Sequence, residues 1–432
     1  MTEPGGESTK MEVEKPQTEE KKPTTDGEPS ASEENASKYP DMQLAQKIHR
    51  LRVLSSATPL LDIDDAGALG IPKDLNKLVM EEVAGENVEN PSLYRQLKTS
   101  LHWDGGLSEE QLAVMDEKHK KTLEELEKKV EEAKESAGDM EVLGSRFEVA
   151  RFAAKSLGKD EALEAYDKLL ALPKLSSGKT IDALMESSRV ASFHGDTRKN
   201  GVLIDRATKL AQEGGDWDRR NRLKVYKALS KMLLRDIKVA ANLLIDCIAT
   251  FSCNELCSYS DFVVYAILTN ILHLPRPDLK EKIIDGPEIL SVSKDIPTVI
   301  RLVNSLYECD YKAYLHAVVD LQPILVADRF LQPHCGFIMR ELHVLGYKQF
   351  LDSYKSVTLE SMAASFGVGT EYLDLQLSRF IAAGRLSAKI DKYGGVVETN
   401  RPDLKNAQYR DMIQKGDLLL NRIQKLARVV DL

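Results

Sequence analysis

A helical pattern that returns every 36 to 39 residues constrains this chain more than any other feature of its sequence. A second helix follows each first helix after a short loop, for example at 160–172, 201–213 and 236–250. The first helices are predicted to begin near Gly144, Thr180, Arg219, Ser258 and Pro297. Such a period is typical of stacked helix pairs that form a curved solenoid, whose extended surfaces usually hold other proteins. We therefore expect a tetratricopeptide-like scaffold over residues 140–335.

Two different regions precede the repeat. Residues 1–39 form an acidic tail, whose first 38 residues hold ten acids and five lysines with few large apolar side chains. Such a composition cannot offset the entropy of folding, so we expect disorder there. Residues 40–139 are predicted to be helical and include one long amphipathic helix over 108–138. That helix could form a free coiled coil, but its apolar spacing favours packing against the rest of the chain.

Two further regions follow the repeat. Within 336–402, helices at 360–366 and 370–383 precede two short alternating runs, which is the order of a winged helix. A last helix is expected from about residue 408 to 430 within the segment 403–432. Its apolar stripe has near-heptad spacing and consists of Met412, Leu419, Ile423, Leu426 and Val430. The predicted fold is thus all-α: a helical-repeat solenoid, a small winged-helix subdomain and a C-terminal helix.

Composition and motifs argue against most kinds of chemistry. The net charge of −9 gives no electrostatic reason to bind nucleic acid or an anionic membrane. No run of 18 apolar residues is present, and an N-terminal signal peptide is not expected. Five scattered cysteines fit a reducing compartment, so we expect a cytoplasmic and nuclear protein. No complete catalytic, nucleotide or zinc motif occurs, so we predict a non-enzyme without cofactors or metals.

The segment with winged-helix order could join protein chains or bind nucleic acid. Its second helix offers one Arg and one Gln against Glu371 and Asp374, which is poor for reading bases. Lys389 and Asp391 are expected to point away from the local core, and Val397 lies in the second strand. We therefore predict that this small sheet accepts a strand of another chain through its main-chain groups.

A Gly-Gly-Asp-Trp sequence marks the junction between two helix pairs. Gly214 and Gly215 permit a left-handed end to one helix, and Asp216 can cap the next. Trp217 would then lie at the corner between the pairs. Either internal packing or contact with another subunit could use this tryptophan, and the sequence leaves both possibilities open.

Four segments of the chain carry a family resemblance. They are Glu213–Tyr226, Ser378–Leu386 with Lys389–Lys392, Val397–Asp403 and Lys415–Arg422. Together they resemble the PCI proteins, which occur in the proteasome lid, the signalosome and an initiation factor. The resemblance runs from about residue 40 to the end, implies a PCI module over about 230–402, and is strongest to the proteasome lid branch.

The resemblance implies a non-catalytic structural subunit of the lid that acts in assembly and in ubiquitin-dependent protein degradation. It also implies that PCI subunits pair through their winged helices and that their C-terminal helices gather into a bundle. The implied partners are other PCI subunits of the lid, its deubiquitinating metalloprotease subunit, a small acidic lid protein and the ATPase ring. Two alternatives remain: the equivalent scaffold subunit of the signalosome, and a winged-helix protein that binds nucleic acid.

Overall fold

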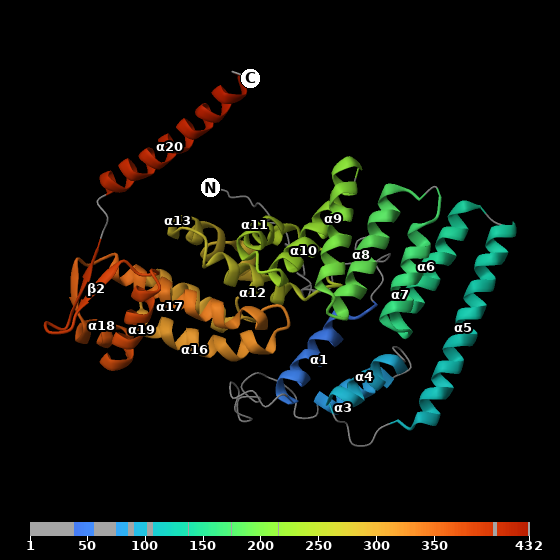
Figure 1. Cartoon of the computed structure of the whole chain (residues 1–432). Helices are drawn as coiled ribbons and strands as arrows, with labels where there is room; N and C mark the ends of the chain where they lie inside the picture. Colours follow the sequence, from blue (N-terminus) through green and yellow to red (C-terminus); the bar gives the residue numbers. More distant parts are fainter. Residues whose placement is uncertain are drawn as a thin grey trace, which may run out of the picture. The chain divides into compact units, whose positions relative to one another are not determined.

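The structure is a computed structural model in which residues 37–432 form one compact unit. It describes residues 39–55, 75–84, 90–101, 107–136, 138–173, 175–214, 216–400 and 404–430. Helices dominate these ranges, and the only strands in them form one small sheet (Figure 1). None of the described helices is long and apolar enough to cross a membrane. The prediction of an all-α solenoid with a winged helix and a C-terminal helix is confirmed.

The N-terminal region has a core of its own. Its elements are α1 (Met42–Ser55), α3 (Leu75–Ala84), α4 (Pro91–Leu101) and α5 (Glu109–Ser136). Apolar residues at helical spacing, such as Ile48, Val79 and Leu97, are buried together in this core. Ser108 begins α5 by exchanging hydrogen bonds with Gln111. Leu112 and Val130 of α5 are buried, so the predicted packing of this helix against its own chain is confirmed.

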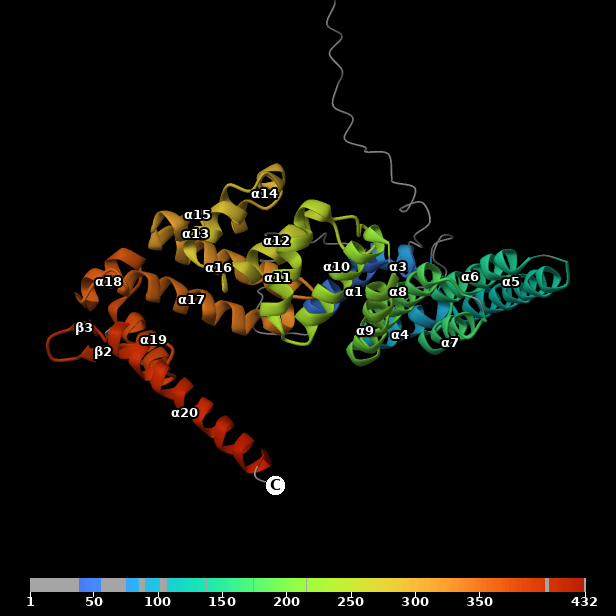
Figure 2. The same ribbon diagram turned by 90° about the horizontal axis from the view of Figure 1, so that it is seen from above.

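The repeat consists of helix pairs that lie side by side in both views (Figures 1 and 2). The first three pairs are α6 (Asp139–Ser156) with α7 (Lys159–Leu170), α8 (Ser177–Phe193) with α9 (Thr197–Gly214), and α10 (Trp217–Leu233) with α11 (Ile237–Cys247). A short 3-10 turn, η1 (Ile248–Thr250), extends α11. These bounds lie within a few residues of those that the sequence period predicts.

The later repeats are less regular. After α12 (Tyr259–Asn270) the second helix is broken into α13 (Arg276–Leu279), the π-helical η2 (Lys280–Ile284) and α14 (Pro287–Val292). Proline at the first positions of two of these pieces explains why each starts anew. The chain continues through α15 (Pro297–Glu308), α16 (Tyr311–Ala327), η3 (Gln332–His334) and α17 (Cys335–Leu351).

Ion pairs connect successive layers of the repeat at nearly the same sequence spacing. Arg219 makes a two-pronged contact with Asp182, its Nε and Nη2 atoms lying 2.9 and 3.0 Å from the two carboxylate oxygens. Arg222 contacts Glu255 at 2.6 Å, and the Tyr226 hydroxyl donates to the same carboxylate. Burial of these charges is tolerable because each one is paired. The ion pairs therefore join residues about one repeat length apart in the sequence.

Helix α1 joins early and late parts of the repeat. The Gln46 side-chain amide donates to the buried Asp328 carboxylate at 2.7 Å, and its oxygen accepts the Arg329 backbone N–H at 3.1 Å. Arg329 in turn donates to the carbonyls of Ser192 and Phe193 at the end of α8. Burial raises the pKa of Asp328, even though the Tyr265 hydroxyl and two backbone amides donate to it.

The winged helix contains α18 (Leu359–Phe366), α19 (Thr370–Ala382), β2 (Ala388–Asp391) and β3 (Val396–Thr399), all close to the predicted ranges. A strand that the sequence analysis missed, β1 (Ser356–Thr358), completes an antiparallel sheet of order β1-β3-β2. Aromatic rings join α18 to α17: the ring centroids of Tyr347 and Phe366 lie 5.0 Å apart, and those of Phe350 and Phe366 5.4 Å.

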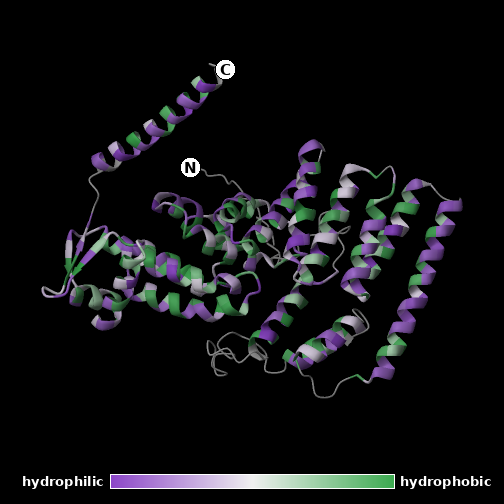
Figure 3. Ribbon diagram, viewed as in Figure 1, coloured by the Kyte–Doolittle hydropathy of each residue, from purple (hydrophilic) through white to green (hydrophobic). Residues whose placement is uncertain are grey.

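The final helix, α20 (Leu404–Val430), begins a few residues before the predicted start. All its side chains that the structure describes, from Lys405 to Arg428, are exposed. Hydropathy colouring shows apolar residues distributed along the whole of α20 (Figure 3). The alternative in which this helix packs on its own domain therefore does not describe this structure.

Candidate functional site

The apolar surface of α20 is broader than the predicted stripe. Met412, Leu419, Ile423 and Leu426 are each more than half exposed, as the near-heptad spacing requires of an unoccupied stripe. Tyr409, Ile413, Leu418 and Leu420 are also exposed and lie beside that stripe. The side chain of Val430 falls outside the described residues. The heptad pattern predicted the central stripe of this surface. The full width of the surface becomes clear only when the three consecutive leucines are placed around the helix at 3.6 residues per turn.

The small sheet offers an open edge, but not where the sequence analysis placed it. Strand β3 pairs with both neighbours, so Val397 lies opposite Val357 on one side and Ile390 on the other. Its side chain is fully buried. The second predicted strand, which holds Val397, is therefore not the strand that could accept another chain, because a third strand, β1, covers the far side of β3.

Strand β2 is an edge strand of this sheet. Lys389 and Asp391 are exposed there, whereas Ala388 is buried, as the alternation predicted. The Asp391 carboxylate accepts the Tyr393 backbone N–H at 3.0 Å and so shapes the turn that follows. Lys392 lies 3.4 Å from Asp374 and connects this turn to α19. Lys389 therefore remains the better candidate for contact with another chain.

The exposed face of α19 is unlike a base-reading surface. Tyr372 and Leu375 are about half exposed on it, and Asp374 is engaged by Lys392. A helix that reads DNA instead presents several basic or amide side chains toward bases and phosphates. Arg379 is the one basic side chain of α19, and it is exposed beside Tyr372 and Leu375, so this face offers a single cation and two large apolar groups, which favours a protein partner.

The Gly-Gly-Asp-Trp junction is partly as predicted. Asp216 precedes α10 and its carboxylate accepts the Trp217 backbone N–H at 2.8 Å. Gly214 is the last residue of α9 and has no left-handed backbone, while Gly215 lies outside the described residues. The Trp217 side chain is 65% exposed. Internal packing therefore does not account for this tryptophan.

The structure also bears on the candidate thiols. Cys247, Cys253 and Cys257 are buried. Burial raises the pKa of Cys247 to about 11 and raises those of Cys253 and Cys257 well above the ordinary range, so all three remain protonated thiols. Within the described ranges, no group of three His, Cys, Asp or Glu residues is arranged to hold a metal ion.

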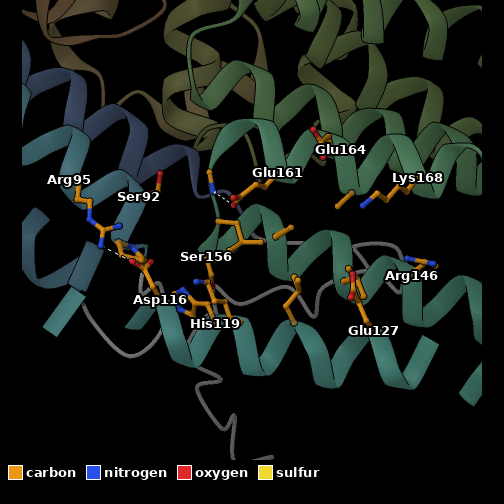
Figure 4. A pocket seen from close by; sticks show the side chains of 18 residues that line it. Ser92, Arg95, Asp116, His119, Glu127, Arg146, Ser156, Glu161, Glu164 and Lys168 are labelled. Carbon is orange, nitrogen blue, oxygen red and sulfur yellow. Dashed lines mark hydrogen bonds and ion pairs between the residues drawn. The ribbon is translucent and has the colours of Figure 1, made fainter. Parts of the chain in front are cut away.

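A cavity of about 540 Å³ lies among α4, α5, α6 and α7 (Figure 4). Its rim mixes basic and acidic side chains, and Arg95 pairs with Asp116 at 2.7 Å across one end. His119 and Ser156 lie deeper, near the contact of α5 with α6.

Comparison with known families assigns three parts of the chain. Residues 108–282 match the family described as 26S proteasome subunit RPN7, and residues 318–401 match the PCI domain. Residues 408–430 match the C-terminal helix of the 26S proteasome regulatory subunit RPN7/PSMD6 family. The last match coincides with α20, and the PCI match includes the entire winged helix.

Individual relatives agree with these matches. A 26S proteasome non-ATPase regulatory subunit 6 homolog of Arabidopsis thaliana is 45% identical, with 79% of this chain and 87% of the relative covered. The subunit 6 protein of Oryza sativa is 40% identical over 92% of this chain and 98% of the relative. COP9 signalosome complex subunit 1 of Arabidopsis thaliana is only 25% identical over 45% of each chain. The proteasome branch is thus favoured over the signalosome alternative, and the predicted non-catalytic regulatory role is confirmed. The chain belongs to the family of the 26S proteasome non-ATPase regulatory subunit 6.

Proposed function

We propose that this chain is a structural subunit of the proteasome lid, held in the assembly by α20 and by the open edge of its small sheet. The observation that carries the proposal is the exposed apolar surface of α20. Eight large apolar side chains of this helix are each more than half exposed. An isolated helix with such a surface is unfavourable in water, and burial against other helices removes the cost.

The width of this surface indicates how many partners it needs. Leu418, Leu419 and Leu420 are consecutive, so they spread over roughly 200° of the helix circumference at 3.6 residues per turn. One partner helix covers only a narrow seam, as in a two-stranded coiled coil. A surface of this width is covered when a helix has neighbours on two or more sides, as inside a bundle. The arrangement supports a bundle built from C-terminal helices of several subunits.

The open edge of β2 provides a second contact. Edge strands present unpaired main-chain groups that a strand of another protein can use, and Lys389 offers a charged side chain beside them. The exposed Trp217 at the junction of α9 and α10 is a candidate for a third contact. We divide the chain accordingly into a tail (1–39), an N-terminal region (40–139), a solenoid (140–335), a winged-helix end (336–402) and a bundle helix (403–432).

The proposed neighbours are other PCI subunits of the lid. Its deubiquitinating metalloprotease subunit, a small acidic lid protein and the ATPase ring complete the set. The chain would act in the cytoplasm and nucleus, in assembly of the particle and in ubiquitin-dependent protein degradation. Family membership and the exposed surface of α20 support this role, and the poor DNA-reading face of α19 argues against the nucleic-acid alternative.

Replacing two residues at the centre of the apolar surface tests the proposal. Leu419→Asp combined with Ile423→Asp should leave the isolated chain folded, because neither side chain contributes to its core. Burying those two residues is worth about 3–6 kcal/mol before ordering costs, so co-purification with other lid subunits should fall at least tenfold. The measurement is the amount of tagged chain that co-elutes with assembled lid.

A matched control introduces the same two charges on the opposite face of α20. Gln414→Asp with Asn421→Asp should co-elute like the unmodified chain, because these positions lie on the face opposite Leu419 and Ile423. Equal co-elution of both double variants with the lid would refute the proposal. A lower melting temperature of the isolated Leu419 and Ile423 variant would refute it too, since the helix would then serve its own domain.

A further inference from the structure

We propose that a basic hollow between α5 and α6 binds a short acidic peptide of another protein. The hollow has a volume of about 470 Å³ and is called the lysine hollow here after Lys118, Lys121 and Lys155. His119, Phe152 and Ser156 also line it. This site uses neither α20 nor the sheet. It deepens the proposed function, on which it rests, because a small acidic lid protein is among the proposed neighbours.

The floor of the hollow is firmly held. The His119 ring is buried, and it meets Phe152 edge to face with the ring centroids 5.8 Å apart. Lys155 places its ammonium 5.2 Å from the centroid of the Tyr39 ring, which fixes this lysine at the border of the hollow. In Figure 4, His119 and Ser156 appear at the contact between the two helices. The hollow therefore has a fixed, partly aromatic base bordered by lysine side chains.

The charges at the hollow all have one sign. Three lysines converge on it from two helices, and no carboxylate belongs to its described lining. The neighbouring cavity of about 540 Å³, which shares His119 and Ser156, has acidic and basic groups paired at its rim. The lysine hollow thus carries a net positive charge, whereas the rim of the adjacent cavity has charges of both signs. An anionic ligand would satisfy three ammonium groups at once, and proteins use such basic clusters to recognise acidic motifs.

Two features select a short acidic peptide over nucleic acid. Along α5, the acidic residues Glu117 and Glu125 lie one turn on either side of Lys121, so the basic area ends quickly. Nucleic acid requires a longer basic track along its phosphates. A volume of this size holds a few side chains, and Phe152 offers one apolar contact. The fitting ligand is therefore an extended segment with two or three carboxylates flanking one apolar side chain.

Fluorescence anisotropy with the full chain tests the proposal. The probe is a fluorescein-labelled peptide of about nine residues with the sequence Glu-Asp-Glu-Leu-Asp-Glu-Phe-Glu-Asp, used at low salt. Lys118→Glu with Lys121→Glu should weaken its binding at least tenfold, because two attractive charges become repulsive. Both positions are exposed, so helicity by circular dichroism should not change. The affinity of the unmodified chain should also fall as salt rises.

The control reverses two lysines of the same helix that do not line the hollow. Lys128→Glu with Lys129→Glu makes the same charge change at exposed positions and should alter binding less than twofold. The proposal is overturned if the unmodified chain does not bind the peptide, or if both double variants lose binding equally. It is also overturned if a single-stranded oligonucleotide binds as tightly and responds to the same variants, since the site would then be a general polyanion surface.

Discussion

The layers of the repeat and helix α20 use similar residues in opposite ways. In the layers, apolar side chains are buried and charged ones pair with the next layer, as Arg222 does with Glu255. In α20, the described apolar side chains are exposed, and its Lys415–Asp411 pair lies in water. Both regions have apolar residues at helical spacing. The spacing therefore predicts that a face will be buried. In the repeat the partner lies in the same chain, and for α20 we propose that it lies in another chain.

Breaking a charged pair in each region should give the largest difference between them. The Arg222 and Glu255 side chains are only 12% and 7% exposed, so Arg222→Met leaves a buried carboxylate without its cation. We expect the free energy of unfolding to fall by about 3–5 kcal/mol. Burial and the Glu255 charge act on this guanidinium in opposite directions, and its raised pKa shows that the attraction prevails.

The matched change in α20 is Lys415→Met. Its partner Asp411 is one helical turn away, and both side chains are largely exposed, so the expected loss is about 0.5 kcal/mol or less. Urea unfolding of both variants measures the difference. A loss below about 1 kcal/mol for Arg222→Met would mean that water reaches Glu255, and the contrast between the two regions would then fail.

A glycine-to-alanine change should have opposite signs in the two regions. A Cβ atom at Gly346 would lie 2.8 Å from Cε1 of the buried Tyr314 ring, so Gly346→Ala should cost about 1–3 kcal/mol through overpacking. A Cβ atom at Gly416 of α20 would meet nothing within 4 Å beyond its chain neighbours and the backbone of its own helix. Gly416→Ala should therefore raise helicity and stabilise the isolated chain by up to about 1 kcal/mol. Urea unfolding and circular dichroism measure both changes, and a neutral Gly346→Ala would contradict the close packing of α16 against α17.

The sequence predicted elements whose signals are local and repeated. The repeat, the two helices of the winged helix and α20 all have apolar residues at helical spacing over many positions. Strand β1 escaped because Ser356–Thr358 is too short to show an alternating pattern. Its absence from the prediction left unrecognised that Val397 lies in the central strand, since strand order depends on distant pairing and not on local sequence.

The contacts of the site depended on three-dimensional arrangement even more strongly. The partner of Arg219, Asp182, lies 37 residues away and is reached only once the layers stack. The exposure of Trp217 depends equally on how α9 meets α10. The lysine hollow combines residues of α5 and α6 that are about 35 positions apart, so no contiguous sequence motif predicts it. Only the apolar stripe of α20 lies on one continuous segment, and it was found.

The last expected effect is a pH dependence that the N-terminal region and the repeat should have and α20 should lack. Burial lowers the pKa of His49 on α1 and of His194 after α8, each to about 4. Near pH 5 the two histidines are protonated in the unfolded chain, where their pKa values are near 6.5, but they stay neutral in the folded chain. The free energy of unfolding therefore falls as the pH drops below 6.5 toward 4. Each ring keeps some contact with water, so the loss by pH 5 should be about 1 kcal/mol or less per histidine.

His49→Gln with His194→Gln should therefore reduce the decrease in melting temperature between pH 7 and pH 5. Since α20 contains no histidine, the double variant should assemble with lid subunits at pH 7 as the unmodified chain does. An unchanged pH dependence of melting would show that neither ring is held neutral by the fold.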